Sequence, residues 1–270
     1  MSARPIFVVA GVGNGKAYSR VFSKAGYNVA LIARNADYLN SFAEEIRADG
    51  GEAHPFPISN YAATSIKDAF AAIKTQWPAS PLRVALFNTA YGRWKVCDLR
   101  FSTRYSLTFV MFRHVPQPFM EITTEEIQES VDTNIVAAFA FAHEVITAFM
   151  ALDADQGTGT RGTLLFTGAS AAVQSTAINS VLAVGKFGLR ALAQSLAKEF
   201  GKEDIHVAHV VVDGNIVTDL SRPFIPANKL EDPAGTLNPN SIGNSYLYLA
   251  NQDRSAWTWE LDLRPAHAQW

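Results

Sequence analysis

The chain has 270 residues, 48% of them hydrophobic and 18% charged, and it carries a formal net charge of −2. This apolar fraction excludes an intrinsically disordered chain, and the near balance of 23 basic and 25 acidic residues leaves no positive field for nucleic acid. The single cysteine, Cys97, excludes a disulfide framework, and with six scattered histidines it offers no metal-site spacing. We therefore expect a folded protein that binds neither nucleic acid nor a metal ion.

The first apolar run, residues 5–10, is short and leads directly into glycines, so it predicts a buried strand instead of a secretory signal. No uninterrupted run reaches the ~18 apolar residues that a transmembrane helix requires. The expected location is therefore the cytoplasm, and no membrane partner is expected.

Short apolar runs alternate with amphipathic segments along the chain. The runs are continuous, which is typical of strands buried on both faces of a parallel sheet. Strands are expected at residues 6–9, 28–33, 53–58, 82–87, 162–166, 207–212 and 257–263. Helices are expected at 16–25, 36–49, through Ile66 and Ile73, at 125–152 and at 184–200, the fourth opened by a capping box from Thr123 to Glu126. The pattern predicts an α/β fold, a single Rossmann-type doubly wound parallel sheet with helices on both faces, in one domain over residues 1–270.

Glycines gather between the first strand and the first helix, in Gly11-Val12-Gly13-Asn14-Gly15. Glycines let the backbone turn tightly and approach a pyrophosphate at a helix N-terminus, where unpaired N–H groups and the helix dipole favour anions. Gly11, Gly13, Asn14 and Gly15 are therefore candidate cofactor-binding residues. The alternative is a flexible turn without a ligand.

The residue after the second strand indicates which dinucleotide is bound. An NAD site usually has an acidic residue there, whereas Ala33-Arg34-Asn35 has none and offers a guanidinium group that can hold a 2′-phosphate. We therefore expect NADP in preference to NAD. The alternative is that Arg34 is a solvated surface charge.

Further motifs follow the later strands. Asn88-Thr89-Ala90 comes after the fourth strand, Asp132-Thr133-Asn134-Ile135 lies in the long helix, and Asp213-Gly214-Asn215-Ile216-Val217-Thr218 comes after the sixth strand. With the glycine loop, their order and spacing resemble the short-chain dehydrogenase/reductase family over nearly the whole chain. The resemblance implies an NADP-dependent oxidoreductase acting on a small carbonyl or alcohol.

The resemblance also implies roles for single residues. Asn88 and Ala90 would lie at the adenosine side of the cofactor, and the Ile216 backbone and the Thr218 hydroxyl would meet the nicotinamide carboxamide. Asn134 would help to hold a proton-relay water. Lys186 matches the lysine of the family's YxxxK motif, which holds the ribose and lowers the pKa of the tyrosine.

The catalytic positions depart from the family pattern. Four residues before Lys186 stands Leu182, and no tyrosine occurs between Tyr105 and Tyr246. Ser170 is the candidate for the hydroxyl that binds the substrate carbonyl, although strict spacing falls on Ala169. Because leucine cannot transfer a proton, three readings stay open: a redox enzyme with another proton donor, a cofactor-binding scaffold with non-redox chemistry, or an inactive homologue.

Residues 96–117 form an insertion that the fold does not require and that shows no helical or alternating pattern. One interpretation is a substrate lid, because loops after the carboxyl ends of parallel strands line the active crevice. The other is a translated, retained intron. Val96-Cys97 can be encoded by a fungal-type 5′ splice site and Gln117 by an acceptor end, so we expect a fungal source.

The resemblance implies assembly as well. In the family, long helices such as those expected at 125–152 and 184–200 pair across two-fold axes, so a homodimer or homotetramer is expected. The proline-containing segment 222–239 lies where the family keeps a substrate loop, and the expected ligand is a small molecule.

Overall fold

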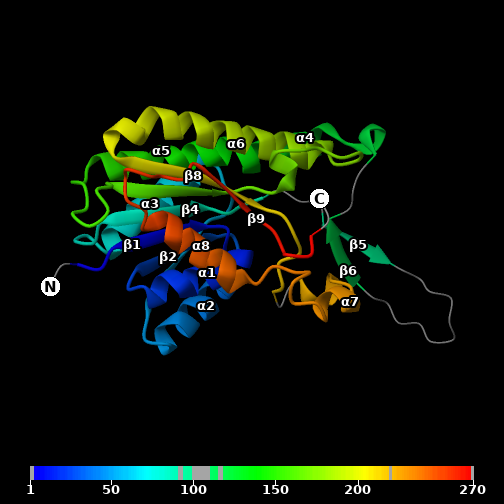
Figure 1. The fold of residues 1–270 in the computed structure, drawn as a ribbon, viewed down its shortest axis with the longest axis horizontal. Coiled ribbons are helices and arrows are strands. Elements are labelled where there is room, and N and C mark those ends of the chain that lie inside the picture. The colour runs from blue at the N-terminus through cyan, green and yellow to red at the C-terminus, as the bar shows by residue number, and fades with distance from the viewer. Residues whose placement is uncertain (1–2, 91–93, 99–109, 115–117, 219–220, 269–270) are drawn as a thin grey trace.

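The computed structural model describes residues 3–90, 94–98, 110–114, 118–218 and 221–268. Seven strands form one sheet in the order β3-β2-β1-β4-β7-β8-β9, and every neighbouring pair in it is parallel (Figure 1). The strands are β1 Ile6–Ala10, β2 Asn28–Ala33, β3 Glu52–Pro57, β4 Leu82–Phe87, β7 Gly162–Thr167, β8 Ile205–Val212 and β9 Glu260–Leu263. The strand order reverses between β1 and β4, which confirms the doubly wound parallel sheet.

Helices cover both faces of the sheet (Figure 1). One face carries α1 Val12–Lys24, α2 Ala36–Ala48 and α8 Pro239–Ala250. The other carries α3 Ala63–Gln76, α4 Thr124–Val131, the π-helical turn η2 Asp132–Val136, α5 Ala137–Met150 and α6 Ser180–Phe200. The strands are buried almost throughout, since their alternate apolar side chains enter two cores, one under each helical layer. Continuous apolar runs are the expected signature of such strands.

Several boundaries follow the sequence pattern closely. β2 and β4 have the expected bounds, and Thr123 caps α4 in the predicted capping box with Glu126. α6 begins at Ser180, four residues before its expected start, so Leu182 lies in its first turn. α8 was not expected. The short turns are η1 Phe119–Glu121, η3 Ser170–Ala172, η4 Gly201–Glu203, η5 Arg222–Phe224 and α7 Ala227–Leu230.

The insertion contributes a separate antiparallel ribbon of β5 Trp94–Asp98 and β6 Val110–His114. The expectation of no regular pattern is therefore wrong for these parts, and the rest of residues 96–117 lies outside the described residues. Trp94 pairs with His114, so the chain leaves and returns at one place. The ribbon projects beside α7, and β6 contacts η5 (Figure 1).

One described helical stretch, Thr124–Met150, is long and apolar enough to cross a membrane by length and composition alone, with a mean hydropathy of 1.4 in its most apolar window. The sequence pattern did not predict such a stretch. Phe141, Val145 and Phe149 of α5 are fully buried in the core beneath α3 and the sheet. Part of this apolar stretch therefore packs in the core, with 44% of its most apolar window buried.

Candidate active site

The carboxyl ends of β1, β4, β7 and β8 lie at one edge of the sheet, because these strands are parallel neighbours. The segments that follow them begin at Gly11, Asn88, Gly168 and Asp213. Ligands of doubly wound folds bind at this edge, where the strand order reverses. The fold therefore gathers most of the candidate residues at one place.

Gly11 makes the turn from β1 into α1 with a backbone φ of +94°. A Cβ atom there would lie 2.8 Å from the backbone of Asn88 and Thr89, so both the conformation and the space require glycine. The Asn88 side chain fixes the turn, because its Nδ2 donates to the Gly11 carbonyl oxygen at 2.7 Å. Asn88 thus holds the glycine loop in place, a contact that the sequence did not specify.

Gly13 and Gly15 lie in the first turns of α1 and differ in their surroundings. A Cβ atom on Gly13 would have no neighbour within 4 Å, whereas one on Gly15 would lie 3.2 Å from Val9. The first turn of α1 carries no acidic side chain. The helix N-terminus is therefore open and favourable to an anion beside Gly13.

Thr167, which the sequence analysis did not select, connects three elements. Its Oγ1 donates to Asn88 Oδ1 at 2.8 Å and lies 2.8 Å from the Tyr246 hydroxyl of α8. Burial raises the pKa of Tyr246 far above its usual value, so the phenol stays protonated and donates to Thr167. A hydrogen-bonded chain thus runs from α8 through β7 to the glycine loop.

Lys186 reaches the same strand from α6. Its Nζ donates to the Thr167 carbonyl oxygen at 2.9 Å, and the residue is only 4% exposed. Burial lowers the pKa of Lys186 to about 8. No carboxylate from the described part of the chain bonds to this ammonium group. A buried cation without an anionic partner is costly, so its retention points to a ligand.

Asn134 lies against Gly185, the residue that precedes this lysine in α6. It belongs to η2, and its Nδ2 donates to the Ser130 carbonyl oxygen at 3.0 Å. A Cβ atom on Gly185 would lie 2.8 Å from the same Nδ2, so α6 passes directly over Asn134. The structure therefore brings Asn134 and the Lys186 turn together. π-Helical turns are frequent at functional sites.

Ser170 and Leu182 lie in the segment between the end of β7 and Lys186. Ser170 opens η3, which contacts α6, and it is half-buried. Leu182 is also half-buried and lies one helical turn before Lys186. The position next to the lysine therefore holds a hydrocarbon side chain.

Arg34 follows β2 and is exposed, with its guanidinium group 5.9 Å from the centre of the Tyr61 ring. No carboxylate partner of Arg34 occurs among the residues that the structure describes. Asn35 is used differently, since its side chain accepts from the Tyr38 N–H as the N-cap of α2. Arg34 is thus exposed and without a carboxylate partner in the described part of the chain, and its contact with a 2′-phosphate stays a prediction.

Thr218 lies after β8 in a local network with Ser221, which the sequence analysis missed. Ser221 Oγ accepts from the Thr218 N–H at 2.8 Å and from its hydroxyl at 3.0 Å, and it donates to the Ile216 carbonyl. Ile216 also forms a parallel bridge with Leu237. These contacts fix the backbone of residues 216–218 close to the segment that precedes α8.

Ala90 and Asn14 are the remaining two candidates. Ala90 follows β4 and is exposed, while Asn14 lies in α1. The neighbouring Thr89 is buried, and its Oγ1 has no partner among the described residues. Thr89 was not among the predicted site residues, and its hydroxyl can form a hydrogen bond with a ligand at this edge.

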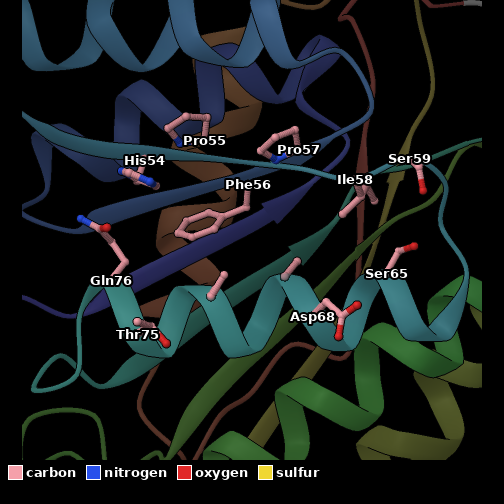
Figure 2. Close-up of a pocket in the computed structure, with 12 residues that line it drawn as sticks. His54, Pro55, Phe56, Pro57, Ile58, Ser59, Ser65, Asp68, Thr75 and Gln76 are labelled. Carbon is pink, nitrogen blue, oxygen red and sulfur yellow. The ribbon is translucent and has the colours of Figure 1, made fainter.

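The cavity shown in Figure 2 lies elsewhere, between the edge strand β3 and α3. Its volume is about 690 Å³, and its lining includes His54, Phe56 and Asp68 but none of the candidate site residues. The features that fit a dinucleotide lie instead at the carboxyl edge of the sheet. They are the open space beside Gly13, the Thr89 hydroxyl without a partner among the described residues, and the buried ammonium group of Lys186.

Solved structures share this fold. A short-chain dehydrogenase from Rhodopseudomonas palustris is 25% identical, with a TM-score of 0.72 and coverage of 97% of this chain and 98% of that one. An alcohol dehydrogenase from the archaeon Thermococcus sibiricus, solved with 5-hydroxy-NADP, is 19% identical, with a TM-score of 0.76 and 98% coverage of both chains. At 19% identity the second comparison shows the fold alone.

The chain is also similar in sequence to curated oxidoreductases. An uncharacterized oxidoreductase of Caenorhabditis elegans is 26% identical over 258 residues, covering 92% of this chain and 72% of the relative. A very-long-chain 3-oxoacyl-CoA reductase of Scheffersomyces stipitis is 21% identical over 199 residues, 74% of this chain and 51% of the relative. The family model for short chain dehydrogenases matches residues 5–229. The chain belongs to the short chain dehydrogenase family.

Proposed function

We propose that this chain is an NADP-dependent oxidoreductase that transfers a hydride between the nicotinamide and a small carbonyl or alcohol. The observation that carries the proposal is Lys186, buried at the edge of the sheet and bonded only to a backbone carbonyl within the described structure. Burying a lysine this way disfavours the folded state. A hydroxyl or phosphate of a bound nucleotide would give the ammonium group the acceptors that it lacks.

The choice of NADP rests on Arg34. Its exposed guanidinium group follows β2, where a 2′-phosphate would accept charge-assisted hydrogen bonds. A Burkholderia cenocepacia short chain dehydrogenase solved with NADP has a TM-score of 0.76, with 99% of both chains covered, at 17% identity. The likeness supports the fold of the site, and Arg34 supports the nucleotide.

The candidate residues would have separate roles in binding the cofactor, orienting the substrate and supplying a proton. Gly11, Gly13 and the first turn of α1 would bind the pyrophosphate, and residues 216–218 would contact the nicotinamide carboxamide. The bound nicotinamide would supply the hydride. Ser170 would orient the substrate oxygen. Leu182 cannot protonate that oxygen, so water near Asn134 and Lys186 or a group of the substrate itself would donate the proton.

A second candidate function is a cofactor-binding homologue with non-redox chemistry or without catalysis. Leu182 favours it, because the position one turn before Lys186 lacks an acid. This candidate predicts that NADPH binds normally but is not oxidised by any carbonyl. It differs from the first candidate only in the chemical step.

A panel of small aldehydes, ketones and alcohols, followed at the nicotinamide absorbance, tests the proposal. The first candidate predicts cofactor turnover that depends on the substrate and is lost in Lys186→Met. Turnover absent across the panel, with intact NADPH binding, would favour the second candidate. Absence of NADPH binding would reject both.

The expected assembly is a homodimer or homotetramer through α5 and α6. Val136 and Phe139 are 47% and 56% exposed, and Val184 and Phe187 on α6 are 61% and 42% exposed. The helices cross closely nearby, since a Cβ atom on Gly188 would lie 2.7 Å from Ile135. We propose that a second copy covers this apolar surface. Sedimentation of Phe139→Asp and Phe187→Glu should then show a smaller species than the unmodified protein.

A further inference from the structure

Thr167 is the last residue of β7 and lies at the carboxyl edge of the sheet, where it is only 9% exposed. It forms polar contacts in two directions. Its carbonyl oxygen accepts from Lys186 Nζ at 2.9 Å, and its Oγ1 donates to Asn88 Oδ1 at 2.8 Å. One buried residue therefore contacts both the lysine of the candidate site and the asparagine that holds the glycine turn.

The Asn88 amide packs directly on the glycine turn. Its Nδ2 donates to the Gly11 carbonyl oxygen at 2.7 Å, and a Cβ atom on Gly15 would lie 3.4 Å from the same nitrogen. The Gly11 carbonyl oxygen can only accept, so the amide nitrogen has to face the turn and Oδ1 has to face away from it. An amide turned the other way round would place two acceptor oxygens against each other. The orientation of the Asn88 amide therefore determines whether this hydrogen bond to the turn forms.

Thr167 and Tyr246 determine that orientation. The Thr167 hydroxyl has a single hydrogen, which it donates to Asn88 Oδ1. The Tyr246 hydroxyl lies 2.8 Å from the same Oγ1 and is therefore the donor to Thr167. Tyr246 is fully buried, so water does not compete for its hydroxyl. The three hydrogen bonds thus run in one direction, from α8 through β7 to the glycine turn.

We propose that Thr167 is a positioning residue for the cofactor, because its hydroxyl fixes the Asn88 amide behind the glycine turn while its carbonyl oxygen fixes Lys186. Tyr246 supplies the donor at the far end of the chain. The role deepens the proposed function, since it rests on the glycine turn binding the pyrophosphate of NADPH. A turn that is already held in its binding conformation gives higher affinity, because the ligand does not have to order it.

A purely structural role of Thr167 predicts a different result. Without its hydroxyl, Asn88 Oδ1 loses a donor and the buried Tyr246 hydroxyl loses its acceptor, so both roles predict a less stable protein. Only the positioning role predicts that a variant that is still folded binds NADPH more weakly. Cofactor affinity therefore separates the two roles, and stability does not.

The test is the NADPH dissociation constant, measured by fluorescence titration at a temperature where each variant is folded. Thr167→Val removes the hydroxyl and keeps the main-chain carbonyl that accepts from Lys186. Loss of one internal hydrogen bond corresponds to about a 3- to 10-fold change in an equilibrium constant, so the dissociation constant should rise by that factor. Thr167→Ser keeps the hydroxyl and should recover most of the affinity. Tyr246→Phe is the second variant in case valine prevents folding, and it should weaken binding about twofold or more.

Tyr18 supplies the matched control. It is a fully buried tyrosine of α1 whose ring meets the Tyr246 ring edge to face at 5.0 Å, and its hydroxyl has no hydrogen-bond partner among the described residues. Tyr18→Phe therefore removes a buried hydroxyl from the same core without breaking the chain to the glycine turn, and it should leave NADPH affinity unchanged. Equal dissociation constants for the unmodified protein and for folded Thr167→Val or Tyr246→Phe would overturn the proposal.

A second readout needs no cofactor. Hydrogen exchange of the Asn88 side-chain amide, followed by NMR of the isotope-labelled protein, should be about tenfold faster in Thr167→Val, because the amide has lost the partner of Oδ1 and opens more often. Tyr18→Phe should leave this rate unchanged. If the unmodified protein does not bind NADPH, the proposed function fails, while the exchange rate still decides whether Thr167 fixes the Asn88 amide. An unchanged rate in Thr167→Val would contradict that role.

Discussion

Leu182 and Lys186 lie one helical turn apart at the start of α6, and only the lysine can exchange a proton. The lysine is buried and bonded to the Thr167 carbonyl oxygen, so the site retains the cation. The resemblance to the family implies a phenol where the leucine stands. The site therefore keeps the buried lysine but has no proton donor at the position one helical turn before it.

Leu182→Tyr should raise carbonyl reduction if the phenol is the only missing group. A general acid typically contributes about 10²–10⁴ in rate, and the ammonium of Lys186 would lower the pKa of the new phenol. The measurement is the turnover number with NADPH and the best carbonyl of the panel. Leu182→Phe adds the ring without the hydroxyl, and equal rates for the Tyr and Phe variants would contradict the expectation.

Lys186→Met should stabilise the fold at neutral pH. The pKa of Lys186 is lowered to about 8, so protonated lysine disfavours folding below pH 8 and this cost disappears as pH rises toward the unfolded value of 10.5. The variant should be more stable at pH 7 by up to about 3 kcal/mol, with the gap narrowing above pH 8. Urea unfolding across pH measures this, with the exposed Lys198→Met as control. A difference in the free energy of unfolding that does not change with pH would contradict the view that protonated Lys186 destabilises the fold.

Arg34→Ala should weaken NADPH binding and leave NADH binding nearly unchanged. Hydrogen bonds to charged groups contribute roughly 1.5–3 kcal/mol, so the NADPH dissociation constant should rise about 10- to 100-fold. Arg34→Lys keeps the charge but not the two parallel N–H donors, so its NADPH dissociation constant should lie between those of the unmodified protein and Arg34→Ala. The same loss for both nucleotides would show that Arg34 does not contact the 2′-phosphate.

Gly11→Ala and Gly13→Ala should separate folding from binding. At Gly11 the left-handed backbone and the contact with Asn88 should make alanine destabilising by about 2 kcal/mol or more. At Gly13 the space is open, so alanine should fold at least as well, with a gain of up to about 1 kcal/mol from helix propensity. NADPH affinity should nevertheless fall about tenfold, because the methyl group takes the place of the pyrophosphate. Thermal unfolding and NADPH titration of both variants distinguish these effects; unchanged affinity in Gly13→Ala would remove the pyrophosphate from this turn.

The fold was predictable because its signals are local. Continuous apolar runs indicate buried parallel strands, and the capping box at Thr123 indicates the start of α4. α8 was missed, since its asparagine, serine and glycine residues weaken the helical signal that its buried Ile242, Tyr246 and Leu249 carry. Helix formation there depends on packing against α1, where Tyr18 and Tyr246 meet edge to face.

The site was predictable only where a motif marks it. Lys186, Asn88 and the glycine loop stand out in the sequence, and the structure joins them. Thr167 does not stand out, because its partners Asn88 and Tyr246 are each 79 residues away in the chain.

The origin of residues 96–117 stays a prediction, whether substrate lid or retained intron of a fungal gene. The genomic nucleotides at the two ends decide the intron hypothesis.

Titration of NADPH fluorescence with the unmodified protein and with Lys186→Met decides whether Lys186 is part of a cofactor site. We expect saturable binding with a dissociation constant on the order of 1–100 µM, and at least about tenfold weaker binding by the variant, because the buried ammonium group loses its ligand contacts. No saturation by the unmodified protein up to about 1 mM, or equal affinity of the two proteins, would contradict a cofactor site built around Lys186.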